Sequence, residues 1–268
     1  MESLGYLACA FIGISLGLIG AGGSILMVPV LVFLFGMPPI LATSYSLFVV
    51  GLTSLFAAFG KFKKGDVLVG SALAFGVTSM VAVLVIRHFI IPILPKSFGH
   101  IGAATVSYDL LSIVLFALLM ILSAYFMLAK RKNTTADEVS GSSSLITSIP
   151  YALLVGAVTG FLGAGGGFIL IPVMTLLLGM NIKQAVGTSL AVIALNSLSG
   201  FANDLGHVNI DWKFLTIVTA IAFAGSIIGA QVADKIDSRK MKAYFGWFVL
   251  LLGIVIITRE GYHFIKII

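Results

Sequence analysis

The sequence predicts an all-α integral membrane protein built from two homologous halves of four apolar segments each. Three observations lead to this prediction. First, 59% of the 268 residues are hydrophobic, 10% are charged and the mean hydropathy is +1.15, so the chain cannot present a water-compatible surface. Second, apolar runs long enough to cross a hydrocarbon core of roughly 30 Å recur along the chain. Third, one glycine-rich element occurs twice in the sequence.

The repeated element shows that the chain is duplicated. Its first copy reads Gly17-Leu-Ile-Gly-Ala-Gly-Gly-Ser-Ile-Leu-Met-Val-Pro29, and its second reads Gly160-Phe-Leu-Gly-Ala-Gly-Gly-Gly-Phe-Ile-Leu-Ile-Pro172. Gly160 lies 143 positions after Gly17, and Pro172 lies 143 positions after Pro29. The same offset continues without a gap as far as Ser54-Leu55 and Ser197-Leu198. A duplication of this extent predicts a two-fold repeated membrane protein, and repeated membrane folds are mostly transporters.

The apolar segments divide evenly between the two halves. They cover about residues 4–36, 40–60, 67–95 and 101–129, and then 148–179, 184–203, 212–233 and 241–258. We therefore expect residues 1–129 to form the first membrane repeat and residues 148–268 to form the second. The polar, serine-rich residues 130–147 are the predicted linker.

The first segment of each half is longer than a single crossing requires. About thirty apolar residues exceed the roughly 20 that span a bilayer, and Gly20, Gly22 and Gly23 lie in the middle of the first such segment. Each glycine costs a helix interior about 1 kcal/mol. The sequence therefore predicts two shorter helices, 4–19 and 24–36, joined at the glycines as a broken helix or a re-entrant hairpin.

The basic loops indicate how the halves are oriented, since cytoplasmic loops carry an excess of Lys and Arg. If each first segment crosses once, these residues divide almost evenly between the two sides. If each first segment returns to the side that it entered, most of them gather on one side. The second arrangement leaves an odd number of crossings per half and predicts inverted repeats, with both termini outside and the linker in the cytoplasm. A parallel pair of four-helix halves is the alternative.

The glycine elements are the candidate binding site. In an inverted repeat the two helix breaks can meet near the bilayer midplane, where lipid offers no partner for freed amide N–H groups. Helices that restart at Gly23-Ser24 and Gly166-Gly167 would aim the positive ends of their dipoles at this point. Such a site favours a small anion, and glycine lets the backbone approach it closely. The alternative is that the glycines only permit close helix packing.

Over nearly its whole length the chain resembles the sulfite exporter TauE/SafE family of membrane transporters. The pattern Gly-x-x-Gly-x-Gly-Gly-Gly followed by an apolar run and Pro carries the resemblance, together with Ala185-Val-Gly-Thr-Ser189. The first copy departs from this pattern, with Ser24 in place of the third consecutive glycine. The resemblance implies transport of small sulfur-containing anions, such as sulfite, sulfonates and organosulfur acids, across the cytoplasmic membrane. It specifies neither the anion, nor the direction of transport, nor the coupling ion.

Hydroxyl and amide side chains follow each glycine element in the next apolar segment. Ser46 matches Ser189 across the repeat, and Thr53-Ser54 matches Asn196-Ser197. These groups could donate hydrogen bonds to an anion, or bond back to carbonyls of their own helices. The candidate substrate-binding residues are Gly20, Gly22, Gly23, Ser24, Gly163, Gly165, Gly166, Gly167, Ser46, Ser189 and Asn196.

Ionisable residues within the apolar segments are few and are functional candidates because of their cost in hydrocarbon. Asp109 is the candidate for proton coupling, since desolvation favours the protonated carboxyl group. Its alternative place is the outer interface, beside Tyr108 in an aromatic belt. Arg87 and Asp204 are interpreted as boundary residues, with a second role open to Arg87, whose guanidinium attracts oxyanions at a pore mouth.

Three other functions are considered. The same fold could carry a carboxylate or a metal ion, or act as a channel, but the scarcity of embedded carboxylates disfavours cations. An intramembrane enzyme is the remote alternative, because Asn196-Ser-Leu-Ser-Gly200 lacks the glycine that precedes a protease serine. We predict no enzymatic activity, cofactor, metal or nucleic-acid partner. The expected partners are a small anion and the lipid bilayer. The oligomeric state is not predicted, because lipid-facing and subunit-facing apolar surfaces have the same composition.

Overall fold

The computed structural model describes residues 2–95, 97–101, 104–128, 145–163, 165–233 and 238–267. Residues 130–144 of the predicted linker lie outside these ranges. The first half contains α1 (Glu2–Ile19), the 3₁₀ helix η1 (Ala21–Leu26), α2 (Met27–Phe33), α3 (Pro39–Lys63), α4 (Val69–Val85), the π-helical turn η2 (Ile86–Ile90), α5 (Ile91–Ile93), β1 (Ser97–Ile101), β2 (Ala104–Ser107) and α6 (Tyr108–Leu128). The second half contains α7 (Leu145–Leu162), α8 (Gly167–Leu177), α9 (Ile182–Asp204), α10 (Trp212–Ala233) and α11 (Ser238–Ile267).

The predicted helical membrane protein is confirmed. Among the described residues, four helices are long and apolar enough to cross a membrane, namely Pro39–Lys63, Val69–Ile93, Lys183–Asp204 and Trp212–Val232. Shorter apolar helices cover Ser3–Leu18, Ser24–Phe33, Leu110–Tyr125 and Ser148–Leu162. Large hydrophobic side chains stand exposed on the outer faces of the helices, as lipid contact requires. They include Leu7, Phe11, Phe59, Val77, Leu122 and Trp247.

Two expected helices differ from the prediction. The fourth apolar segment was expected from residue 101, but the chain first forms the antiparallel hairpin β1–β2, with a bulge between Ser97 and Gly99, and α6 begins only at Tyr108. Gly99 disfavours a helix here, and the β-branched pair Thr105-Val106 favours extended backbone. The expected helix 24–36 is also shorter, because α2 ends at Phe33 and the chain then turns through Gly36 at φ +68°.

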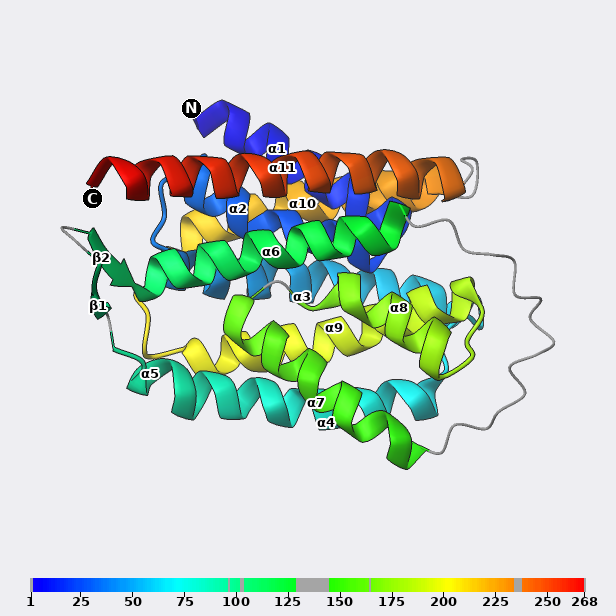
Figure 1. Ribbon diagram of the computed structural model, residues 1–268. Coiled ribbons are helices and arrows are strands. Elements are labelled where there is room, and N and C mark those ends of the chain that lie inside the picture. Colours follow the sequence, from blue (N-terminus) through cyan, green and yellow to red (C-terminus); the bar gives the residue numbers. More distant parts are fainter. Residues whose placement is uncertain are drawn as a thin grey trace.

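The centre of the molecule is the pair α3 and α9, which lie between the other helices (Figure 1). In an 18-residue apolar stretch of each span, 61% of the α3 stretch and 67% of the α9 stretch are buried inside the protein. The corresponding share is 33% in the α4 span and in the α10 span. The two central helices are antiparallel. Ser44, near the start of α3, bonds to Asp204 at the end of α9, and Gly51 further along α3 meets Leu198.

Outer helices of one half pack against outer helices of the other half. These contacts repeat at the 143-residue offset. α1 packs along α10, and α4 packs along α7. A β-carbon at Gly13 would lie 2.1 Å from the carbonyl oxygen of Ala222, and one at Gly156 would lie 2.1 Å from that of Ser79. Gly156 is the repeat counterpart of Gly13, and Ala222 is the repeat counterpart of Ser79, each pair being 143 positions apart. The same backbone approach is therefore built twice, with the roles of the halves exchanged.

Hydrogen bonds that anchor the loops repeat in the same way. The backbone N–H of Asp211 donates to the Tyr45 hydroxyl at 2.6 Å, and that of Leu68 donates to the Thr188 hydroxyl at 3.1 Å. Each donor and each acceptor has its counterpart 143 positions away. The duplication seen in the sequence thus extends to individual contacts between the halves.

Substitution of the glycines in the outer helix pairs is expected to destabilise the protein. In Gly13→Ala and in Gly156→Ala the new methyl group meets a backbone oxygen that cannot rotate away, so the two helices must separate. Overpacking of this kind costs about 1–3 kcal/mol, and the two variants should lose similar amounts. The thermal midpoint of detergent-purified protein measures the loss. Gly70→Ala is the matched control, since nothing lies within 4 Å of its β-carbon; midpoints equal to that of the control would contradict the prediction.

Candidate functional site

The second glycine element forms a left-handed turn between two helices. α7 ends at Leu162 and α8 begins at Gly167. Between them Gly163, Gly165 and Gly166 have φ values of +66°, +69° and +68°, a region that other residues enter only at a cost of roughly 1–2 kcal/mol. The amide of Ile169 donates to the carbonyl oxygen of Gly166 at 3.1 Å, whereas the amides of Gly167 and Phe168, which open the helix, have no acceptor within it. The turn therefore presents N–H groups at the positive end of a helix dipole.

Side chains from three helices pack directly on this turn. A β-carbon at Gly163 would lie 2.4 Å from Cβ of Thr43 in α3, and one at Gly166 would lie 2.1 Å from Oγ1 of Thr159 in α7. At Gly165 it would lie 3.2 Å from Oγ of Ser197 in α9. Glycine is required at these positions because it gives both the positive φ and the space for the two hydroxyl groups.

Several of the polar groups in this region have no hydrogen-bond partner within the described structure. Thr159, Asn196 and Ser197 are completely buried. The hydroxyls of Thr159 and Ser197 are unpartnered, as is Nδ2 of Asn196, although its Oδ1 accepts a 2.9 Å hydrogen bond from Ser79. A buried polar group without a partner costs about 1–3 kcal/mol. The hydroxyls of Thr159 and Ser197 lie beside the turn that opens α8, and the turn with these two donors is therefore a candidate ligand site.

The serines matched by the repeat behave differently from one another. Ser189 donates to the carbonyl oxygen of Val186 at 2.9 Å in its own helix, which is the alternative role considered from the sequence. Ser46 in α3 is fully buried and its hydroxyl has no partner within the described residues; the same holds for Ser54. Unpartnered hydroxyls therefore belong to both central helices.

The first glycine element is built differently from the second. Gly20 has a φ of +80°, but Gly22, Gly23 and Ser24 continue in the short 3₁₀ helix η1. A β-carbon at Gly20 would lie 2.6 Å from a methyl group of Val186, so an apolar side chain covers this turn. The two elements nevertheless meet, because η1 packs against α8.

One predicted residue, Asp109, lies far from this turn along the chain. A second residue, Thr159, lies beside the turn but was not predicted. Asp109 lies in the first turn of α6, and its side chain is outside the described part of the structure. Thr159 was not predicted from the sequence, although its place one helical turn before Gly163 is a usable signal. Its counterpart in the first half is Leu16, so the repeat itself concealed it.

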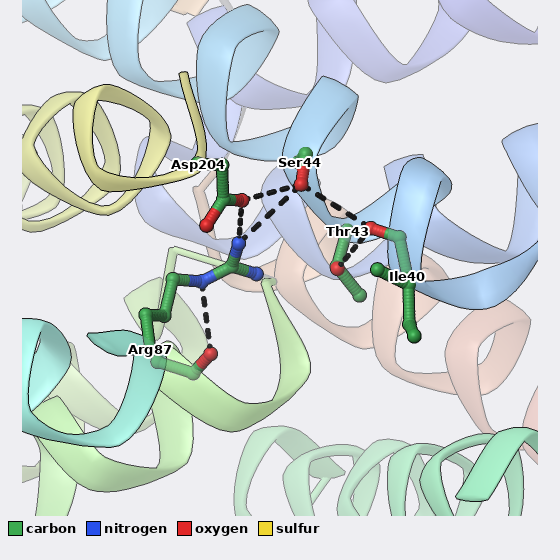
Figure 2. Close-up of polar contacts among 6 residues, drawn as sticks. Ile40, Thr43, Ser44, Arg87 and Asp204 are labelled. Carbon is green, nitrogen blue, oxygen red and sulfur yellow. Dashed lines mark hydrogen bonds and ion pairs between the residues drawn. The ribbon is translucent and has the colours of Figure 1, made fainter. Parts of the chain in front are cut away.

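A buried ion pair was also missed. Arg87 in η2 pairs with the Asp204 carboxylate at the end of α9, and the side chains of the two residues are 3% and 10% exposed. Ser44 donates to the same carboxylate, and Nε of Arg87 donates to the carbonyl oxygen of Gly160 at 3.0 Å (Figure 2). Both residues lie toward the ends of their spans, Val69–Ile93 and Lys183–Asp204, in keeping with their interpretation as boundary residues. The sequence did not reveal that they are buried against each other between the halves.

The chain matches a known family of membrane proteins over residues 6–256, and the description of that family is Sulfite exporter TauE/SafE. The chain belongs to this family. The matched span contains both glycine elements, the central helices and the buried ion pair. The TauE/SafE chain is therefore a membrane transporter and a multi-pass protein of the cell membrane.

Relatives named as probable membrane transporters agree with this assignment, and the matches cover most of each relative's length. A probable membrane transporter protein of Xylella fastidiosa is 27% identical over 256 residues, which cover 93% of this chain and 92% of the relative. One of Methanocaldococcus jannaschii is 27% identical over 91% of this chain and 90% of the relative. The probable membrane transporter protein YunE of Bacillus subtilis is 27% identical over 88% and 90%. No solved structure matches the chain.

Proposed function

We propose that this TauE/SafE transporter is a secondary carrier of small anions, and that its substrates are sulfur oxyanions, sulfonates or related organosulfur acids. The observation that carries the proposal is the start of α8, where backbone amides lie beside the unpartnered hydroxyls of Thr159 and Ser197. All of these groups can donate hydrogen bonds to an oxyanion. The family description, which names sulfite, supports the sulfur chemistry. No enzymatic step and no cofactor is part of the proposal.

The donor set suits an anion that must be both bound and released. Amides and hydroxyls can hold oxyanion oxygens by hydrogen bonds and by the helix dipole, without a permanent counter-charge at the turn. Ser46 and Ser54 in α3 and Asn196 in α9 extend the donors to both halves. An anion at this place would satisfy groups that otherwise remain buried without partners. Asp109 stays the predicted proton-coupling residue.

We also propose that residues 1–129 and 148–268 are inverted repeats. The support comes from α3 and α9, which occupy equivalent places in the duplicated sequence and run antiparallel. When two antiparallel helices that cross the bilayer are related by a two-fold axis, this axis lies in the membrane plane. Carriers of this construction expose a central site alternately to the two sides.

Labelling of single cysteines tests the inverted arrangement. With Cys9 replaced by Ala, a cysteine at Ser143 is expected to react with an impermeant thiol reagent from the cytoplasmic side, and one at Ile268 from the outside. The parallel alternative has both positions on the same side. Reaction of both from one side in right-side-out and inverted vesicles would therefore contradict the proposal.

Loss of the unpartnered hydroxyls is expected to weaken anion binding without destabilising the free protein. Ligand binding raises the thermal midpoint by mass action, so a panel of sulfite, thiosulfate, sulfate, sulfoacetate, acetate and chloride reports affinity. A hydrogen bond to a charged group contributes about 1.5–3 kcal/mol. Thr159→Val and Ser197→Ala should therefore each bind the preferred anion about tenfold more weakly or worse, while the ligand-free midpoint stays unchanged or rises.

Thr53→Val is the matched control for these variants. Thr53 is equally buried in α3, but its hydroxyl already bonds to the carbonyl oxygens of Val49 and Val50 in its own helix. Its replacement should leave anion binding at the wild-type level. Equal losses in Thr159→Val and in Thr53→Val would sink the proposed site. If no anion stabilises the wild-type protein, the anion specificity itself is wrong.

A further inference from the structure

The ion pair of Arg87 and Asp204 connects four helices from both halves. Arg87 comes from the π-helical turn that continues α4, Asp204 ends α9, Ser44 belongs to α3, and the Gly160 carbonyl belongs to α7. Figure 2 shows the guanidinium beside the Asp204 carboxylate and the Ser44 hydroxyl, and its Nε also donates to the Gly160 carbonyl oxygen. Arg87 and Asp204 are 4% and 7% exposed, so the charges are withdrawn from the surroundings of the protein.

The repeated architecture does not require this pair. At the 143-residue offset, Arg87 corresponds to Ala230 and Asp204 corresponds to Lys61. The helix packing around these positions does repeat, because Gly17 meets the backbone of Ser226 as Gly160 meets that of Val83. The same packing thus forms without a buried ion pair. Replacing a buried pair with apolar residues is often neutral or stabilising, so stability alone does not account for it.

The location of the pair points to the transported ligand. Gly160 lies one helical turn before Gly163, where the left-handed turn begins, and its carbonyl accepts from Arg87 Nε. Ser44 follows Thr43, which packs directly on Gly163. The guanidinium is therefore hydrogen-bonded to α7 just before the second glycine element and to α3 beside the residue that packs on its first positive-φ glycine. Buried charges within membrane helices usually lie on ligand pathways, and π-helical turns are frequent at functional sites.

We infer that Arg87 is a charged ligand of the transported oxyanion, and that Asp204 holds the guanidinium in the anion-free protein. The inference rests on the proposed transport of anions. A planar guanidinium donates two parallel hydrogen bonds to a carboxylate and equally to two oxygens of a sulfite or sulfonate group. Asp204 therefore occupies the place that the anion takes. The class of ligand is an oxyanion with at least two accessible oxygens, and chloride lacks this geometry.

The test measures anion-induced thermal stabilisation in four proteins: wild type, Asp204→Asn, Arg87→Gln and the double variant. Sulfite and sulfoacetate are the probes, and chloride is the comparison anion. Asp204→Asn should bind the preferred oxyanion about tenfold more tightly, because the competing carboxylate charge is gone. The double variant removes both charges together and leaves none unpaired. It should elute as a folded protein and bind the oxyanion at least tenfold more weakly than wild type.

Asn203→Ala is the matched control, because it removes another side-chain link between the same helices, the 3.1 Å contact between Nδ1 of His88 and Oδ1 of Asn203, and leaves Arg87 intact. Its oxyanion affinity should equal that of wild type. If the double variant binds with wild-type affinity while Thr159→Val binds weakly, the inference fails and the proposed function stands. Weakening by Asp204→Asn as large as that by Arg87→Gln would also overturn it. If no oxyanion stabilises wild type, both proposals fail.

Discussion

Gly166→Leu is expected to abolish anion transport while the protein still inserts into the membrane. Gly166 has a φ of +68°, and any β-carbon there would lie 2.1 Å from Oγ1 of Thr159. A leucine side chain would displace Thr159 and fill the space in front of the α8 amides. Flux into proteoliposomes measures transport, and the amount of protein in the membrane fraction measures insertion. Flux at least a hundredfold below wild type is expected, since the site is blocked rather than weakened.

Gly36→Leu separates the blocked site from backbone strain. Gly36 also has a φ of +68°, but nothing lies within 4 Å of its β-carbon. The variant therefore carries the same roughly 1–2 kcal/mol of left-handed strain without a collision, and it should transport at close to the wild-type rate. Wild-type flux in Gly166→Leu would rule out the second glycine element as the binding site. Equal inhibition by Gly36→Leu would assign the loss to strain.

Arg87→Gln is expected to be strongly destabilising. It leaves the Asp204 carboxylate buried between the halves without its counter-charge, which costs about 3–5 kcal/mol. Adding Asp204→Asn should recover most of this loss, because neither remaining side chain is charged. Reversible unfolding in mixed micelles, compared with wild type in the absence of small anions, measures both values.

Lys61→Gln is the matched control for this stability prediction. Lys61 is the counterpart of Asp204 in the repeat, and its Nζ lies 3.9 Å from the Asp66 carboxylate in a partly exposed pair. Exposed pairs contribute about 0–1 kcal/mol, so this variant should stay close to wild type. An Arg87→Gln loss no larger than that of Lys61→Gln would show that the buried charges are hydrated in solution.

The sequence by itself determined the class of protein and the places where its helices break. Apolar composition dictates a membrane environment, because the free energy of transfer from water to lipid depends on each side chain almost independently of its neighbours. The glycine clusters interrupt the first segment of each half for an equally local reason, since Gly20 and Gly163 adopt positive φ values. The repeat at a 143-residue offset is evident from the amino-acid sequence alone.

Tertiary structure decided which polar groups come together. Thr159 reaches Gly166 only through the turn between α7 and α8. Asp204 reaches Arg87, 117 positions earlier in the chain, only because α9 packs against α4 and the turn η2 that continues it. Ser46 and Ser189 are equivalent in the repeat, yet only the second bonds within its own helix. A polar side chain in a dry interior is satisfied by whichever group the packing brings within about 3 Å, and that partner is set by the arrangement of helices rather than by neighbouring residues.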